Sequence, residues 1–192
     1  MDGDVVLQSD EEEVYGVNDS GDEIISGYYK LSEIPLKFNR VSGNFDCRGN
    51  NFISLEGGPI TVGGNYDCSF NMLSSLRYGP KQVGGDFDCQ INDLTSLVGG
   101  PVSVGGDYNC SDNLLSSLDG VPATVVNTFN CASNNLNALV GGPVSVGVDF
   151  YCYENDLTSL DGIGKVGGDI EADDDLLKLY NRTQTIKSIL EA

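Results

Sequence analysis

The sequence contains no histidine and no tryptophan among its 192 residues. Without histidine it has neither the Ser–His–Asp nor the Cys–His arrangement that activates the nucleophile in many hydrolases. Histidine is also missing as the usual partner of cysteine in zinc sites, and the sequence has no Cys-x-x-Cys pair. We therefore expect a protein that is not an enzyme and that needs no metal or other cofactor.

Basic residues are scarce, with 10 lysines and arginines against 29 aspartates and glutamates, which gives a formal net charge of −19 at pH 7. Such a chain repels the phosphate backbone, so direct binding to nucleic acid is not expected. No apolar run is long enough to cross a bilayer, and the first residues lack the basic-then-apolar order of a signal peptide. These features predict a cytoplasmic protein that does not bind membranes.

What the sequence does have is repetition. A valine stands six residues before each cysteine, an aromatic residue stands two before it, and apolar residues, nearly all leucine, stand five and eight after it. The cysteines recur every 21 residues, at Cys47, Cys68, Cys89, Cys110, Cys131 and Cys152. An asparagine follows three residues after each cysteine, at Asn50, Asn71, Asn92, Asn113, Asn134 and Asn155. A fixed period of this length predicts a solenoid, in which each repeat buries its apolar side against its neighbours.

The spacing within each repeat predicts its local structure. Valine, aromatic residue and cysteine are separated by even steps, so we expect all three on the inward face of one strand and the residues between them facing outward. The asparagine is expected to turn the chain and to bond to neighbouring backbone groups. The Gly-Gly-Pro segment that closes three of the six repeats is typical of a turn with positive φ.

The pattern aromatic-x-Cys-x-x-Asn-x-Leu-x-x-Leu resembles the leucine-rich repeat family over about residues 41–177. The motif Val-Gly-Gly-Asp-Phe-Asp-Cys at residues 83–89 also resembles the repeats of the short 21-residue-repeat proteins of tailed bacteriophages. Gly-Gly stands where many leucine-rich families carry leucine. The resemblance implies a β-rich, leucine-rich-repeat-like solenoid of parallel strands, and the phage resemblance implies the cytoplasm of a bacterial host as its setting.

We expect one domain, with a cap at each end of the repeats. Residues 1–23 form an acidic leader, either partly disordered or folded over the first repeat, and residues 24–40 form the N-terminal cap. Residues 41–165 hold six repeats. Residues 166–192 hold a degenerate seventh repeat and a helix from Asp174 onward, which we interpret as a capping lid; a partner-binding helix is the alternative.

The six cysteines are interpreted as structural. Each lies on the inward face, where free cysteine behaves as a small hydrophobic residue. In-register strands about 4.8 Å apart aim neighbouring Cβ atoms in the same direction, which is poor geometry for a disulfide. Unpaired thiols also fit a reducing cytoplasm.

The outward strand positions, one and three residues before each cysteine, predict two columns rich in aspartate and asparagine. Their acidic members are candidates for binding a partner: Asp46, Asp67, Asp86, Asp88, Asp107, Asp149, Asp169 and Glu171. The columns could provide solubility, bind a basic protein, or bind calcium. The calcium interpretation is disfavoured because the nonapeptide spacing of calcium-binding β-rolls is missing.

Large residues interrupt the polar pattern at a few positions. Exposed apolar and aromatic residues in a polar field are candidate binding hot spots. These candidates are Phe70, Ile91, Tyr151 and Tyr153. Tyr78, in addition, replaces a turn glycine.

The sequence thus predicts a protein-binding module whose acidic strand face contacts a basic protein. If the phage resemblance holds, it would bind and inhibit a host defence or nucleic-acid-processing protein. Two alternatives stay open: an acidic DNA mimic that occupies a DNA-binding groove, and a structural component of the virion or its assembly. The sequence does not indicate an oligomeric state.

Overall fold

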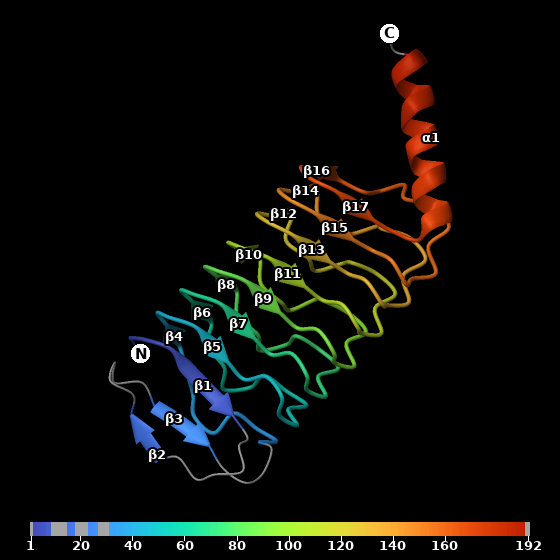
Figure 1. Cartoon of the computed structure of the whole chain (residues 1–192). Helices are drawn as coiled ribbons and strands as arrows, with labels where there is room; N and C mark the ends of the chain where they lie inside the picture. The colour runs from blue at the N-terminus through green and yellow to red at the C-terminus, as the bar shows by residue number, and fades with distance from the viewer. Residues whose placement is uncertain (1, 9–14, 18–22, 27–30, 191–192) are drawn as a thin grey trace.

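The structure is a computed structural model that describes residues 2–8, 15–17, 23–26 and 31–190. It is a solenoid of stacked coils, each built from one repeat of about 21 residues, and the described residues form one helix, α1 (Asp174–Leu190), at the C-terminal end (Figure 1). We number the coils 1 to 6 by their cysteines, from Cys47 to Cys152. The repeat solenoid of parallel strands expected from the sequence is confirmed.

Each coil contributes two short strands to two different sides of the solenoid. The main sheet, in spatial order, contains β17 (Ile170–Glu171), β15 (Phe150–Tyr151), β13 (Phe129–Asn130), β11 (Tyr108–Asn109), β9 (Phe87–Asp88), β7 (Tyr66–Asp67), β5 (Phe45–Asp46), β1 (Val5–Gln8), β3 (Glu23–Ser26) and β2 (Tyr15–Val17). All its pairings are parallel except that of β2 with β3.

The side sheets are formed by the strands that carry the repeat valines. One contains β4 (Arg40–Val41), β6 (Thr61–Val62), β8 (Gln82–Val83) and β10 (Ser103–Val104); the other contains β12 (Thr124–Val125), β14 (Ser145–Val146) and β16 (Lys165–Val166). The expectation that valine, aromatic residue and cysteine share one strand is therefore wrong. A sharp corner separates the valine from the aromatic residue, although both still point inward.

The corner between the two sides requires glycine because successive coils pass very close to each other there. A Cβ atom on Gly84 would clash with the carbonyl oxygen of Gly63, and one on Gly105 would clash with the carbonyl of Gly84. In coil 5 this position is Val126, which is half exposed. The side sheets are divided between β10 and β12, at this coil. The side chain of Val126 at this corner thus explains why the valine-bearing strands form two separate side sheets.

The core is a set of inward columns, one for each apolar position of the repeat. The six cysteines form one column, are fully buried and are unpaired. The thiol of Cys68 donates to the carbonyl of Asp88 in the next coil at 3.4 Å, and that of Cys110 donates to the carbonyl of Asn130 at 3.3 Å. Burial raises the pKa of all six thiols, to about 12 for Cys152, so they stay protonated near neutral pH.

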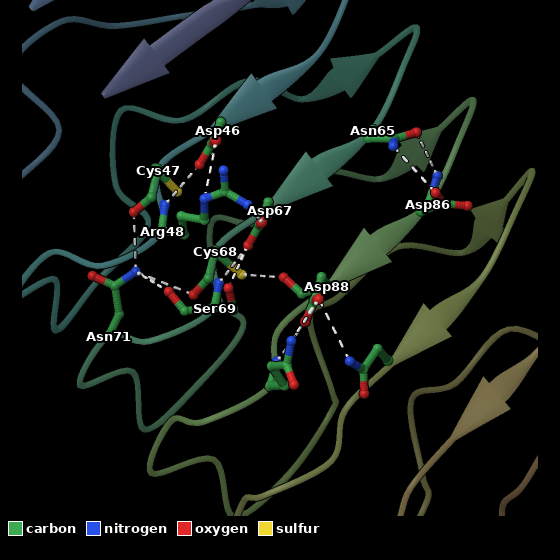
Figure 2. Close-up of polar contacts among 12 residues, drawn as sticks. Asp46, Cys47, Arg48, Asn65, Asp67, Cys68, Ser69, Asn71, Asp86 and Asp88 are labelled. Atoms are coloured by element: carbon green, nitrogen blue, oxygen red, sulfur yellow. Dashed lines mark hydrogen bonds and ion pairs between the residues drawn. The ribbon is translucent and has the colours of Figure 1, made fainter. Parts of the chain in front are cut away.

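The asparagine of each repeat bonds two coils together. The Oδ1 atom of Asn71 accepts the backbone N–H of Phe52 at 3.0 Å. Its Nδ2 atom donates to the carbonyls of Cys47 and Cys68, each at 3.1 Å (Figure 2). The same pattern repeats from Asn50 to Asn155. These contacts satisfy backbone groups at a buried corner, where an unpaired group would be costly.

The N-terminal residues supply an additional coil. Val5 pairs with Phe45 in β5, and Val5 and Leu7 are fully buried. Asn50 donates to the carbonyl of Leu7 at 2.8 Å, as Asn71 does to that of Cys47. Residues 3–7 therefore correspond to residues 43–47, with leucine in place of cysteine.

Of the two alternatives for the leader, residues 2–8 follow the second and fold against the first repeat as an additional coil. The return half of this coil comes from the N-terminal cap, where the Leu31 N–H donates to Asn50 Oδ1 at 3.1 Å and Ile34 is buried. The rest of the leader, residues 9–14 and 18–22, lies outside the described residues.

The helix α1 covers the last coil with its beginning only. Leu176 and Tyr180 are half-buried and pack against the core, whereas residues 181–190 are all exposed. The helix points away from the stack (Figure 1). Ile189 and Leu190, near its C-terminal end, are 69% and 80% exposed. The described part of the chain contains no helix long and apolar enough to cross a membrane.

The first testable prediction separates the two parts of this helix. A chain ending after Asn181 should melt within about 2 °C of the full chain, because the deleted residues bury almost nothing. A chain ending after Asp175 should melt clearly lower or aggregate, because Leu176 and Tyr180 no longer cover the last coil. Circular dichroism melts with light scattering measure both. Equal melting of the two truncated chains would contradict the assignment.

The second prediction concerns the aromatic column, which contains two tyrosines among phenylalanines. The hydroxyls of Tyr66 and Tyr108 are buried without an oxygen or nitrogen partner among the described residues, and only a weakly bonding thiol, that of Cys47, lies beside the Tyr66 hydroxyl. Tyr66→Phe and Tyr108→Phe should leave the free energy of unfolding unchanged or raise it by about 1 kcal/mol.

The matched reverse change is Phe87→Tyr, in the coil between them. It buries an additional hydroxyl and should lower the free energy of unfolding by about 1–3 kcal/mol in urea titrations. A loss of stability in both Tyr→Phe variants would show that the hydroxyls are paired.

Candidate functional site

The outward side chains of the main sheet form an acidic face. It contains two columns, one and three residues before each cysteine, which we call the inner and the outer column. Figure 2 shows Asp46, Asp67 and Asp88 of the inner column and Asn65 and Asp86 of the outer one. The structure therefore brings the sequence-predicted acidic candidates onto one surface, running from β5 to β17.

The inner column ends the main-sheet strands of coils 1 to 5 with a side-chain turn. The Oδ1 atom of Asp67 accepts the backbone N–H of Ser69 at 3.0 Å, and Oδ1 of Asp88 accepts that of Gln90 at 3.0 Å. Asn109 makes the same contact with Ser111 at 3.1 Å. An asparagine and an aspartate thus serve the fold equally well at this position, so the negative charge itself is not required by the turn.

The outer column forms a second ladder between coils. Asp86 Oδ1 accepts the backbone N–H of Asp107 at 2.9 Å, and Asp107 Oδ1 accepts that of Thr128 at 2.9 Å. Asp149 does the same for Asp169 at 2.8 Å. The sequence predicted only surface roles for these aspartates: solubility, or the binding of a basic protein or of calcium. The structure gives Oδ1 of Asp86, Asp107 and Asp149 a structural contact, while Oδ2 of Asp86 accepts from Asn65 Nδ2 at 3.1 Å.

The acidic face is hollowed near its N-terminal end. A depression of about 260 Å³ is lined by Asp46, Asp67, Asp86 and Asp88, together with Arg48 and neighbouring asparagines. Arg48 forms ion pairs of 3.3 Å with both Asp46 and Asp67. Burial raises the pKa of Asp46 and Asp88, against the lowering effect of their hydrogen-bond donors. Among the described residues, no cluster of three or more acidic or cysteine side chains could hold a metal ion.

The corner that follows each cysteine has an unusual backbone. The second residue after the cysteine has positive φ in all six coils: Gly49 (69°), Phe70 (55°), Ile91 (51°), Asp112 (54°), Ser133 (54°) and Glu154 (54°). This left-handed conformation suits glycine and small polar residues, and it is strained for a bulky or β-branched one. Phe70 and Ile91 are nevertheless 50% and 39% exposed, so little core packing compensates for the strain.

Two further residues extend this apolar surface. Met72 and Leu114 lie four residues after their cysteines and are 52% and 48% exposed. The Phe70 N–H donates to the carbonyl of Gln90 at 3.0 Å, which places Phe70 beside Ile91 in the next coil. We call Phe70, Met72, Ile91 and Leu114 the apolar corner. Sequence reasoning missed Met72 and Leu114, although this position is asparagine or aspartate in the other four coils.

The remaining candidates lie apart from this corner. Tyr151 takes the inner-column position in coil 6, and its hydroxyl donates to Asp149 Oδ2 at 3.3 Å. Desolvation and the nearby carboxylates raise the pKa of its phenol. Tyr153 is half-buried in the same coil, and Asp169 and Glu171 are exposed at β17. Three coils, or about 15 Å, separate Ile91 from Tyr153, so the large residues do not form one patch.

The third prediction tests the inner column. Burial raises the pKa of the folded Asp88 carboxyl, so its ionised form destabilises the fold near neutral pH, and this penalty disappears as the pH falls through the raised pKa. Asp88→Asn should therefore raise the melting temperature near pH 7 and have less effect near about pH 3. Asn109→Asp, in the next coil, should do the opposite. A lower melting temperature for Asp88→Asn near pH 7 would contradict the argument.

Comparison with known proteins adds no relative to this picture. No family model, no curated protein and no solved structure matches the chain. The chain's own six repeats still allow comparison, because each position of the repeat occurs six times in similar surroundings.

Proposed function

We propose that the chain is a non-enzymatic protein-binding module, whose acidic face and apolar corner together bind a protein with a basic surface. The observation that carries the proposal is the pair Phe70 and Ile91. Both are large, apolar and exposed, and both stand where the backbone is left-handed. Gly49, Asp112 and Ser133 satisfy the same corner in other coils, so the fold does not need these bulky side chains.

Strain that the fold does not require is typical of functional positions. Phe70 directly follows Ser69, whose backbone N–H and hydroxyl bond to Asp67, so the apolar corner adjoins the acidic face. Apolar anchors beside a charged surface are the usual composition of a protein interface. The carboxylates would raise the association rate, and the buried anchors would lengthen the residence time.

For the biological setting, we propose a reducing bacterial cytoplasm. Six unpaired thiols fit such a compartment, and the repeat wording resembles that of bacteriophage proteins with leucine-rich-type repeats. The partner would then be a host defence or nucleic-acid-processing protein that the chain binds and inhibits.

DNA mimicry is the second candidate. The carboxylates of Asp67 and Asp88 recur in register at strand spacing, as phosphates recur along a duplex. A mimic would depend on these columns and not on the apolar corner. A role as a virion or assembly component remains the third candidate, and it would be supported by co-purification with particles.

The fourth prediction distinguishes the first two candidates. Partners captured from bacterial lysate by the full chain would be re-tested by surface plasmon resonance with the double variant Phe70→Ser and Ile91→Asp. Both replacements are residues that other coils use at this corner, so the melting temperature should not fall. Binding should weaken at least about tenfold, mainly through faster dissociation.

The matched controls are a change at the same corner in coil 6 and a change of charge alone. Glu154→Ser should leave binding unchanged. Asp67→Asn with Asp88→Asn should slow association at low salt and have little effect at high salt. Unchanged binding by the Phe70 and Ile91 double variant, with loss of binding in the Asp variants, would reject the apolar anchor and favour mimicry.

A further inference from the structure

A second unusual corner lies away from the acidic face, where the leucine segment of coil 2 turns into the side sheet. The tenth residue after the cysteine has positive φ in every coil, and five coils have glycine there: Gly57, Gly99, Gly120, Gly141 and Gly162, with φ from 82° to 107°. Coil 2 alone has a side chain at this position, Tyr78, at φ 69° and 47% exposed. The fold accepts glycine here five times, so the tyrosine serves something other than the turn.

Two basic residues lie near Tyr78 in the sequence, and one of them contacts its ring. The guanidinium carbon of Arg77 lies 4.9 Å from the ring centroid, which is a cation–π contact. Lys81 Nζ donates to the carbonyl of Gly99 at 2.6 Å, which fixes this ammonium group in the adjoining coil. Both cations are exposed, so their charges face solvent beside the ring.

A groove of about 360 Å³ runs beside this ring. Its lining includes Lys37, Phe38, Glu56, Ile60, Tyr78 and Lys81. Ile60 is 54% exposed and gives the groove an apolar floor next to the ring. Three of the chain's ten basic residues, Lys37, Arg77 and Lys81, therefore lie at one corner of a protein whose net charge is −19, and Glu56 is the acidic residue of the lining.

We propose that this basic corner, made of Lys37, Arg77, Tyr78 and Lys81, binds an acidic peptide segment that carries an aromatic or apolar residue. The cations supply complementary charge, and Tyr78 with Ile60 supplies the apolar contact. Recognition occurs through side chains, because the backbone nearby is already paired: the Lys81 N–H donates to Ile60 at 2.7 Å and the Ile60 N–H to Asn39 at 3.0 Å.

A peptide fits the geometry better than a single phosphate group. Lys37 lies two turns of the solenoid away from Arg77 and Lys81, because Asn39, Ile60 and Lys81 stack in successive turns, so the cations are spread over about 10 Å along its axis. Lys81 is already held by a carbonyl and Arg77 by a ring, so the cations do not converge on one point as they do around a bound phosphate. The ligand has the opposite charge to the partner proposed for the acidic face, so this site can succeed or fail independently of it.

The fifth prediction uses a random copolymer of glutamate and tyrosine, in a ratio of about four to one, as the probe. At near-physiological salt, where long-range repulsion from the rest of the chain is screened, calorimetry should detect binding to the full chain. Tyr78→Gly should weaken this binding at least about tenfold while the melting temperature stays the same or rises, because glycine is what the other coils use. Lys81→Ser should also weaken it, since one of the cations is removed.

The control variant is Val140→Ser, which changes an exposed residue at the same corner three coils away and should bind the copolymer normally. Polyglutamate without tyrosine should bind more weakly than the copolymer. The proposal is overturned if the copolymer does not bind, if Tyr78→Gly binds it as well as the unchanged chain does, or if inorganic tripolyphosphate competes fully at equal charge concentration.

Discussion

The solenoid depends on hydrogen bonds that asparagine side chains make between coils. Each coil turns sharply after its cysteine, and this turn leaves backbone groups pointing into the core. One asparagine per coil satisfies them on both sides: Asn92 accepts the N–H of Leu73 and donates to the carbonyls of Cys68 and Cys89. Because these groups are buried, losing the asparagine would expose several of them to an apolar environment at once. The turn, the period and the stacking therefore follow from the same side chain.

The polar surface serves the fold as well. Outer-column residues such as Asn44 and Asp86 each accept a backbone N–H from the following coil, and inner-column residues close their own strands. Aspartate and asparagine are interchangeable in these contacts, since both offer an oxygen acceptor. The fold therefore does not require the excess of aspartate over asparagine on the acidic face. This excess places four carboxylates around the depression beside Arg48.

The internal repeats distinguish structural from functional side chains without any relative. Positions where all coils agree, such as the cysteine and asparagine columns, are explained by burial and hydrogen bonding. At other positions one or two coils carry a large residue on left-handed backbone, where the remaining coils have glycine or a small or polar residue. The fold does not explain these large residues, which are Phe70, Tyr78 and Ile91. These departures lie on two corners with opposite electrostatic surroundings, acidic beside Phe70 and basic around Tyr78. The chain therefore presents two different kinds of surface on neighbouring coils.

Periodicity by itself determined the solenoid, the inward cysteines and the outward acidic columns, because a repeat imposes one environment on each position. It could not reveal β1, since Leu7 replaces the cysteine and a long insertion separates Val5–Gln8 from the return segment at Leu31. Nor could it separate valine from aromatic residue: even spacing predicts one strand, and only close contact between coils at glycines such as Gly84 forces the corner. The sequence predicted a helix from Asp174 that caps the last repeat, but the direction of α1, which leaves Ile189 and Leu190 in solvent, is decided by how its first turns meet the last coil. Left-handed backbone at Phe70 and Ile91 likewise emerges only in three dimensions, because φ depends on the path that the whole coil must follow.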